Sequence, residues 1–115
     1  MTRAILFRNP DDSWAGFQIS GHSGYGEEGT DIVCAGISAL TITCVNAMES
    51  ICGIQMAVNG GEDGFLEAML PRKLTSDKQH DAQLLLAVLH QGLKDLAETY
   101  PEYLTMHIQK RRNSP

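Results

Sequence analysis

The sequence predicts a single α+β domain over residues 1–115, with about five mostly antiparallel strands and two helices in the order ββαββαβ. Three observations support this prediction. A length of 115 residues fits one domain. Short segments in which apolar and polar residues alternate indicate strands. Two long segments repeat apolar residues at steps of three and four, as amphipathic helices do.

The first two strands are expected to form a hairpin. Residues 4–7 are apolar, and residues 9–13 (Asn-Pro-Asp-Asp-Ser) have the composition of a turn. Apolar and polar side chains alternate in residues 14–22, which predicts the second strand. Residues 21–30 then contain four glycines and are predicted to be a mobile loop.

A long helix is expected next, with Thr30 or Asp31 as its N-cap and Gly53 as its stop. Apolar residues at steps of three and four give this helix one apolar face, and the rest of its surface is also small and apolar. The sheet and either the second helix or a dimer partner must therefore cover it. The run without charge at residues 32–48 is at the lower limit for a membrane span. Because it contains four polar residues, we interpret it as a buried helix of a soluble protein and expect no membrane contact.

The second half is expected to add two strands, a helix and a final strand. The strands are predicted at residues 54–58 and 65–70, with a turn at 59–64, and the last strand at 104–109. The helix is expected to begin at Ser76, because Gln79 three residues later completes a capping box, and to end at Tyr100-Pro101.

The charge distribution excludes a general nucleic-acid binder. The formal net charge is −5, and no Lys or Arg lies between Arg8 and Arg72. Nine carboxylates in that stretch give it a formal charge of −9. Such a field favours cationic partners and repels phosphate groups, whose neutralisation dominates nucleic-acid affinity. Residues 110–112 are basic and are interpreted as part of a solvated tail.

The cysteines indicate neither a disulfide nor a metal site. No export signal is visible at the N-terminus, so a cytoplasmic protein with reduced thiols is expected. Cys34, Cys44 and Cys52 all fall on the predicted first helix, too far apart along its axis to form a bridge. No Cys or His pair has zinc-like spacing. No metal and no other cofactor is therefore expected.

One of the three thiols differs from the others. Cys44 and Cys52 are interpreted as small buried hydrophobic residues. Cys34 lies in the first turn if Asp31 is the N-cap, where unpaired N–H groups and the helix dipole favour the nucleophilic thiolate. His22 follows the preceding strand and is a possible base for it. The residues alone leave open an exposed loop histidine beside an ordinary helix-start cysteine.

Two segments resemble the ribosomal-processing cysteine protease family of bacteria, the Prp or YsxB-like family. They are Gly-His-Ser at 21–23 and Gly-Thr-Asp-Ile-Val-Cys-Ala-Gly-Ile-Ser at 29–38. The family pattern is Gly-His, a glycine-containing loop, then Asp-Ile-Val-Cys-Ala and a Ser four residues after the Cys. Ser23 and Gly36 stand where the family usually has Ala, and both are small-for-small changes. Chain length and element order are similar throughout.

The resemblance implies a cysteine endopeptidase in which Cys34 is the nucleophile and His22 the general base and acid. Asp31 and Ser38 match the other signature positions as possible supporting residues, although a hydroxyl at Ser38 that bonds back to its own helix is an alternative. The family removes a short N-terminal extension from a large-subunit ribosomal protein, number twenty-seven. Its members are homodimers.

The loop before the helix is a candidate lid for substrate, formed by Gly24, Gly26, Glu27, Glu28 and Gly29. Its glycines match a dinucleotide fingerprint, but the two glutamates would repel a pyrophosphate and the element order is wrong for that fold. A role from another class is a non-catalytic acidic module that binds a basic ribosomal protein. Rapid alkylation of Cys34 that depends on His22 would distinguish the peptidase from this module.

Overall fold

A computed structural model describes residues 1–21, 30–62 and 64–111. The elements are β1 (Thr2–Arg8), β2 (Trp14–Ser20), α1 (Thr30–Ser50), β3 (Ala57–Glu62), β4 (Phe65–Met69), α2 (Ser76–Thr99) and β5 (Leu104–Lys110). This order, together with one five-stranded sheet, confirms the predicted ββαββαβ fold.

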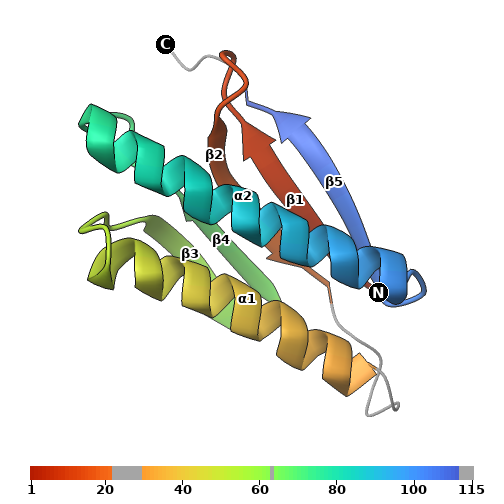
Figure 1. Cartoon of the computed structure of the whole chain (residues 1–115). Helices are drawn as coiled ribbons and strands as arrows, with labels where there is room; N and C mark the ends of the chain where they lie inside the picture. The colour runs from red at the N-terminus through yellow and green to blue at the C-terminus, as the bar shows by residue number, and fades with distance from the viewer. Residues whose placement is uncertain (22–29, 63, 112–115) are drawn as a thin grey trace.

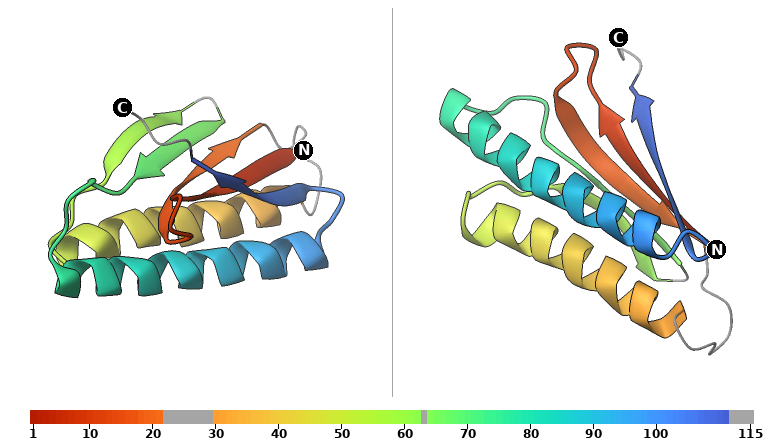
Figure 2. Two further views of the ribbon diagram at one scale, coloured as in Figure 1. Left: turned by 90° about the horizontal axis from the view of Figure 1, so that it is seen from above. Right: turned by 45° about the vertical axis from the view of Figure 1, so that its right-hand side comes forward.

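The strands lie in the spatial order β3-β4-β2-β1-β5, and both helices cover the same face of the sheet (Figures 1 and 2). Three neighbouring pairs are antiparallel, while β5 returns alongside β1 in parallel after α2. The β3–β4 hairpin therefore pairs with β2 rather than forming a separate sheet. This arrangement places the end of β2 beside the β3–β4 turn.

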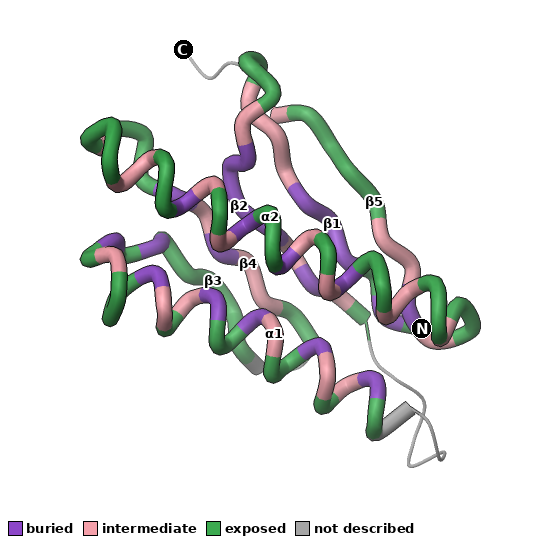
Figure 3. The backbone as a smooth tube through the Cα atoms, viewed as in Figure 1, coloured by how far each residue is buried: buried purple, intermediate pink, exposed green. Residues whose placement is uncertain are grey.

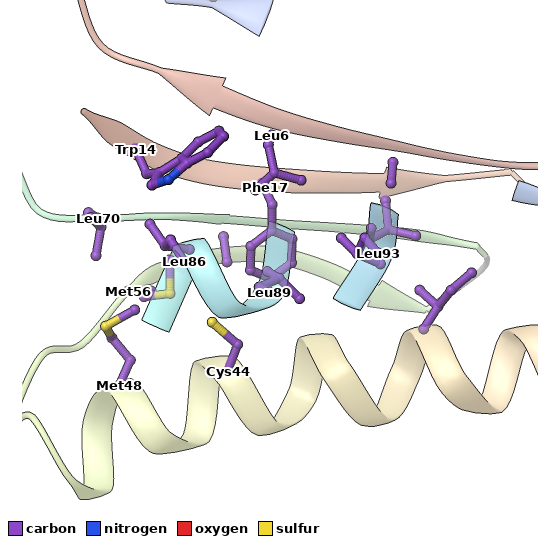
Figure 4. Close-up of a cluster of buried hydrophobic side chains, with 14 of the residues drawn as sticks. Leu6, Trp14, Phe17, Cys44, Met48, Met56, Leu70, Leu86, Leu89 and Leu93 are labelled. Atoms are coloured by element: carbon purple, nitrogen blue, oxygen red, sulfur yellow. The ribbon is translucent and has the colours of Figure 1, made fainter. Parts of the chain in front are cut away.

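The core lies between the sheet and the two helices. Leu6 on β1 is paired with Phe17 on β2, and both side chains are fully buried because alternate strand residues point to the helical face. Cys44 and Met48 of α1 and a row of leucines on α2 complete the cluster (Figure 4). The buried leucines are Leu86, Leu89 and Leu93.

Helix α2 covers one side of α1, as the apolar surface of α1 requires. The helices approach closely at two glycines. A Cβ atom on Gly36 would lie 3.3 Å from the side chain of Leu96, and one on Gly92 would lie 3.0 Å from Leu40. Small residues at these points allow the two helices to pack. The outward side of α1 stays exposed in the single chain (Figure 3), and Ile32 is 64% accessible there.

By length and composition alone, Ile32–Ser50 of α1 could cross a membrane. In the folded chain, this helix instead supplies four buried side chains to the core: Val33, Ile37, Cys44 and Met48. The interpretation of α1 as a core helix is therefore consistent with the structure.

Several predicted boundaries are wrong. β3 begins at Ala57 and continues to Glu62, through residues predicted to form a turn. It stays paired with β4 past this irregular segment because the register of the pairing shifts between Gly60 and Glu62. Residues 54–56 lie outside any strand, although Ile54 is buried.

Helix α2 begins at Ser76, as predicted, but its cap differs. Its N-cap is Thr75, not Ser76: the Thr75 hydroxyl accepts a hydrogen bond from the N–H of Lys78, and Gln79 is one residue too far along for the predicted capping box. The predicted stop of α1 is supported, since Gly53 has a φ of +66° and donates its N–H to the carbonyl of Glu49.

Candidate active site

Cys34 lies near the start of α1 and is half-buried at a cavity of about 290 Å³. Helix α1 contributes its side chains along successive turns, and the ends of β1, β2 and the β3–β4 hairpin form the remaining walls. The lining residues are Thr2, Ile19, Gly21, Cys34, Ile37, Ser38, Thr41, Ile42, Gly61, Gly64, Phe65 and Leu66. The thiol therefore opens on a hollow built from most of the fold.

The end of β2 is held firmly at this cavity. The N–H of Gly21 donates a 3.0 Å hydrogen bond to the carbonyl of Gly64, next to the pairing of Ser20 with Phe65. Gly21 has a φ of +98°, and a Cβ atom there would collide with the carbonyl oxygen of Met1. Only glycine fits this position without strain. The backbone is thus fixed at the residue that precedes His22.

The cavity combines apolar walls with hydroxyl groups. Ile19, Ile42 and Phe65 are among the apolar side chains, and Thr2, Ser38 and Thr41 supply the hydroxyls. The Thr41 hydroxyl is already used, because it donates a 2.8 Å hydrogen bond to the carbonyl of Ile37. Such a lining suits an extended peptide with an apolar side chain.

Ser38 lies one helical turn after Cys34 and lines the same cavity, as its spacing predicts. The alternative of a buried Ser38 is wrong, because its side chain is exposed. The hydroxyl that bonds back to the helix belongs to Thr41 instead.

The remaining predicted site residues lie outside the described part of the chain. His22, Gly24, Gly26, Glu27, Glu28 and Gly29 are in the segment 22–29, and the side chain of Asp31 is also not described. The Cys34–His22 pairing and the lid therefore stay predictions.

The helix begins earlier than predicted. Thr30 is its first residue, so Thr30 and Asp31 lie within the helix rather than capping it, and Cys34 is the fifth helical residue. Cys34 therefore lies beyond the first turn, within which the effect of the helix dipole is largely confined.

The other two thiols do not line this cavity. Cys44 is 6% exposed within the core, as predicted, and burial raises the pKa of its thiol to about 11, with a smaller contribution from Cys52. Cys52 is half-buried just beyond the end of α1, and both carry free thiols. Of the three, Cys34 alone faces the hollow.

The sequence does not predict the part of the cavity wall that comes from β1, β3 and β4. Thr2, Gly61 and Phe65 reach the cavity because β4 pairs with β2 and β1 lies on the other side of β2. The one local signal was the glycine before His22, since an isolated glycine at a strand end marks a strained backbone or a close approach.

Comparisons with known proteins agree with this geometry. The family model described as cysteine protease Prp matches residues 1–105. The ribosomal processing cysteine protease Prp of Bacillus subtilis is 30% identical over 105 residues, which cover 90% of this chain and 94% of the relative.

Two crystal structures of the essential ribosomal processing protease Prp from Staphylococcus aureus are similar in fold. One holds a substrate peptide and superposes with a TM-score of 0.80 at 25% identity, over 94% of this chain and 99% of that chain. The other holds a covalently linked product peptide and gives a TM-score of 0.79 at 26% identity, with the same coverage of both chains.

Proposed function

Because the chain belongs to the Prp family of cysteine proteases, we propose that Cys34 is its nucleophile and His22 its general base and acid. The chain is a cysteine peptidase of the ribosomal processing type. The observation that supports this assignment is the cavity shared by Cys34 and Gly21, the residue directly before His22. A nucleophile and a base must come within hydrogen-bond reach of each other.

The proposed reaction is acyl transfer in two steps. His22 accepts the proton of Cys34, and the sulfur attacks the scissile carbonyl carbon to form a tetrahedral oxyanion. The C–N bond then breaks, the amine leaves with the proton from His22, and a thioester stays on Cys34. Water activated by His22 hydrolyses the thioester and restores the thiol. Backbone N–H groups near the start of α1 are the proposed oxyanion donors.

The proposed substrate is the N-terminal extension of large-subunit ribosomal protein number twenty-seven. Two features support a basic peptide with an apolar segment. The cavity wall contains Ile19, Ile42 and Phe65, and the stretch between Arg8 and Arg72 carries nine carboxylates with no cation. Ribosomal proteins are cationic because they neutralise RNA phosphates, so the acidic half of this chain attracts them.

The direct experiment is incubation of the full chain with the extended ribosomal protein, beside a Cys34→Ala variant as control. The expected result is a loss of substrate mass equal to the extension, in the wild type only. Unchanged mass in both reactions would contradict the proposed substrate. Cleavage by both proteins would contradict the proposed nucleophile.

We further propose that residues 24–29 form a lid whose Glu27 and Glu28 attract the basic substrate. Replacing both glutamates by glutamine should raise KM more at low salt than at high salt, because exposed charges are screened by ions. Equal effects at both salt concentrations would contradict this role.

A homodimer is proposed as the cover for the outward helical face. Ile32 on α1 and Leu84 and Val88 on α2 are all more than half exposed in the single chain, and burial of such side chains is favourable. Analytical ultracentrifugation tests this directly. A single species of 12.6 kDa at high micromolar concentration would contradict the dimer.

We place the protein in the cytoplasm, where a ribosomal substrate is available before assembly. Fractionation of cells into membrane and soluble parts tests this placement, and recovery with the membranes would contradict it. The non-catalytic binding module has less support, because the related S. aureus structures hold a substrate peptide and a covalently linked product peptide.

A further inference from the structure

A second cavity, larger than the catalytic one, lies at the other end of β2. Its volume is about 460 Å³. The β1–β2 turn, the segment that leads from β4 to α2, and the end of β5 form its walls. The lining residues include Asn9, Asp11, Pro71, Arg72, Gln79 and Arg111. None of the residues that line the catalytic cavity lines this one.

Two guanidinium groups line this cavity and are not engaged elsewhere in the described structure. Within residues 1–21, 30–62 and 64–111, neither Arg72 nor Arg111 forms a side-chain hydrogen bond or ion pair. Nearby cations behave differently. Arg8 donates to the carbonyl of Asp12 and lies over the Trp14 ring, and Lys110 pairs with Asp12.

The carboxylate in the cavity does not neutralise these arginines by contact. One oxygen of Asp11 accepts from the Ser13 hydroxyl at 2.6 Å and from the Ser13 N–H at 3.0 Å. These bonds hold Asp11 in the β1–β2 turn and lower the pKa of its carboxyl group. No ion pair joins Asp11 to either arginine in the described residues. Two arginines therefore line the same cavity as one carboxylate that is held by its own turn.

The chemistry of the wall restricts the ligand. The arginine fork matches phosphate oxygens in two parallel hydrogen bonds. The volume exceeds the need of phosphate alone, and Leu70, Pro71 and Leu74 give the cavity an apolar part. The amides of Asn9 and Gln79 add donors and acceptors.

We propose that this cavity is a binding site for a small phosphate monoester, in which Arg72 and Arg111 hold the phosphate group and the apolar wall contacts the organic part. The ligand is of nucleotide or sugar-phosphate size, since binding sites of this kind have volumes of about 300–1,000 Å³. The site lies apart from Cys34, and its occupation does not depend on the peptidase reaction.

The test is an NMR titration of the ¹⁵N-labelled full chain with AMP, with adenosine and inorganic phosphate as separate arms. We expect saturable shifts for the backbone amides of residues 9–13 and 70–79 with AMP. Adenosine should give none, and inorganic phosphate should bind more weakly than AMP. Arg72→Gln and Arg111→Gln should each weaken AMP binding about tenfold or more, the effect of one lost charge-assisted contact.

Arg3→Gln is the matched control, because Arg3 is an exposed cation on β1 that does not line the cavity. It should leave AMP affinity unchanged while removing the same charge. Arg111→Lys, which keeps the charge and the fold, should restore part of the affinity lost in Arg111→Gln. Peptidase activity of all these variants should match the wild type.

Three results would overturn the proposal. The first is no saturable shift with AMP up to about 10 mM, a concentration that would detect even millimolar affinity. The second is an equal loss of affinity in Arg3→Gln, which would show attraction by overall charge. The third is equal binding of inorganic phosphate and AMP, which would remove the role of the apolar wall.

Discussion

The two halves of helix α1 place the same side chain in opposite environments. Cys34, near the start, is half-buried at a cavity reached by the ends of three other segments. Cys44, ten residues later on the same helix, points into the core beside Met48 and Leu89 (Figure 4). Burial there raises the pKa of its thiol to about 11, which leaves it protonated and unreactive at neutral pH.

This difference shows that the exposure of a thiol is set by what covers the helix and not by the helix itself. Around Cys44 and Met48, the sheet and α2 bury the inner side of α1. At the first half, β2 has ended and the β3–β4 turn leaves a hollow. A buried cysteine stabilises the fold, whereas a cysteine at the hollow is available for chemistry.

Exchanging each thiol for alanine gives the largest expected contrast. Cys34→Ala should lower kcat/KM for the extended substrate by at least about 10³-fold, the order expected when a nucleophile is removed. Cys44→Ala should keep kcat/KM within about twofold and lower the free energy of unfolding by roughly 1 kcal/mol, because it leaves a small cavity. Steady-state cleavage and urea unfolding measure the two effects, and an active Cys34→Ala enzyme would contradict the comparison.

Disturbing the backbone at the hollow should have the next largest effect. In Gly21→Ala, the added Cβ must displace Met1 or move the end of β2, so kcat/KM should fall roughly 10–100-fold as the segment carrying His22 shifts. Gly53→Ala is the matched control, because Gly53 lines neither cavity. Its φ of +66° is also strained for alanine, but the nearest atom to the added Cβ is in the flexible Lys78 side chain, at 3.6 Å.

Peptide cleavage and thermal unfolding of both glycine variants separate strain from collision. A loss of activity in Gly53→Ala as large as that in Gly21→Ala would mean that backbone strain, and not the contact with Met1, explains the result.

The last effect concerns stability at high pH and does not involve the catalytic cavity. The thiol of Cys44 has a pKa of about 11 in the folded chain and an ordinary value of 9.0. Between these values the unfolded chain loses the proton first, so it binds fewer protons than the folded chain. Stability from this group is therefore present below about pH 9 and falls as pH rises toward 11, by at most about 2–3 kcal/mol.

Urea unfolding at pH 8 and pH 10.5 measures this loss, with Cys44→Ala as the control because it removes the titrating group. The variant should lose less stability than the wild type over the same interval. Equal losses would show that other groups, such as lysines, account for the whole change.

The contrast between the two cysteines was only partly predictable. The helix, the strands and the burial of Cys44 follow from local periodicity, because each apolar face must be covered. The hollow at Cys34 depends on β4 pairing with β2, a contact between segments about fifty residues apart. The path of β3 through Asn59 and Gly60 was also missed, since a register shift turns an expected loop into strand.

The second cavity was unpredictable for the same reason. The sequence indicates a solvated tail at Arg111, but the N–H of Arg111 donates to the carbonyl of Arg8, and Arg111 lines a cavity with Arg72. The parallel pairing of β5 with β1 places it there. Charge segregation along the sequence was visible, but only the fold shows which cations share a surface.

The most direct test of Cys34 as a nucleophile activated by His22 is its alkylation rate in the native protein. Intact and peptide mass spectrometry after brief exposure to iodoacetamide at neutral pH give the rate for each cysteine. We expect Cys34 to react first, Cys44 to stay unmodified, and the Cys34 rate to fall in His22→Ala. A Cys34 rate that is unchanged in His22→Ala would contradict the account.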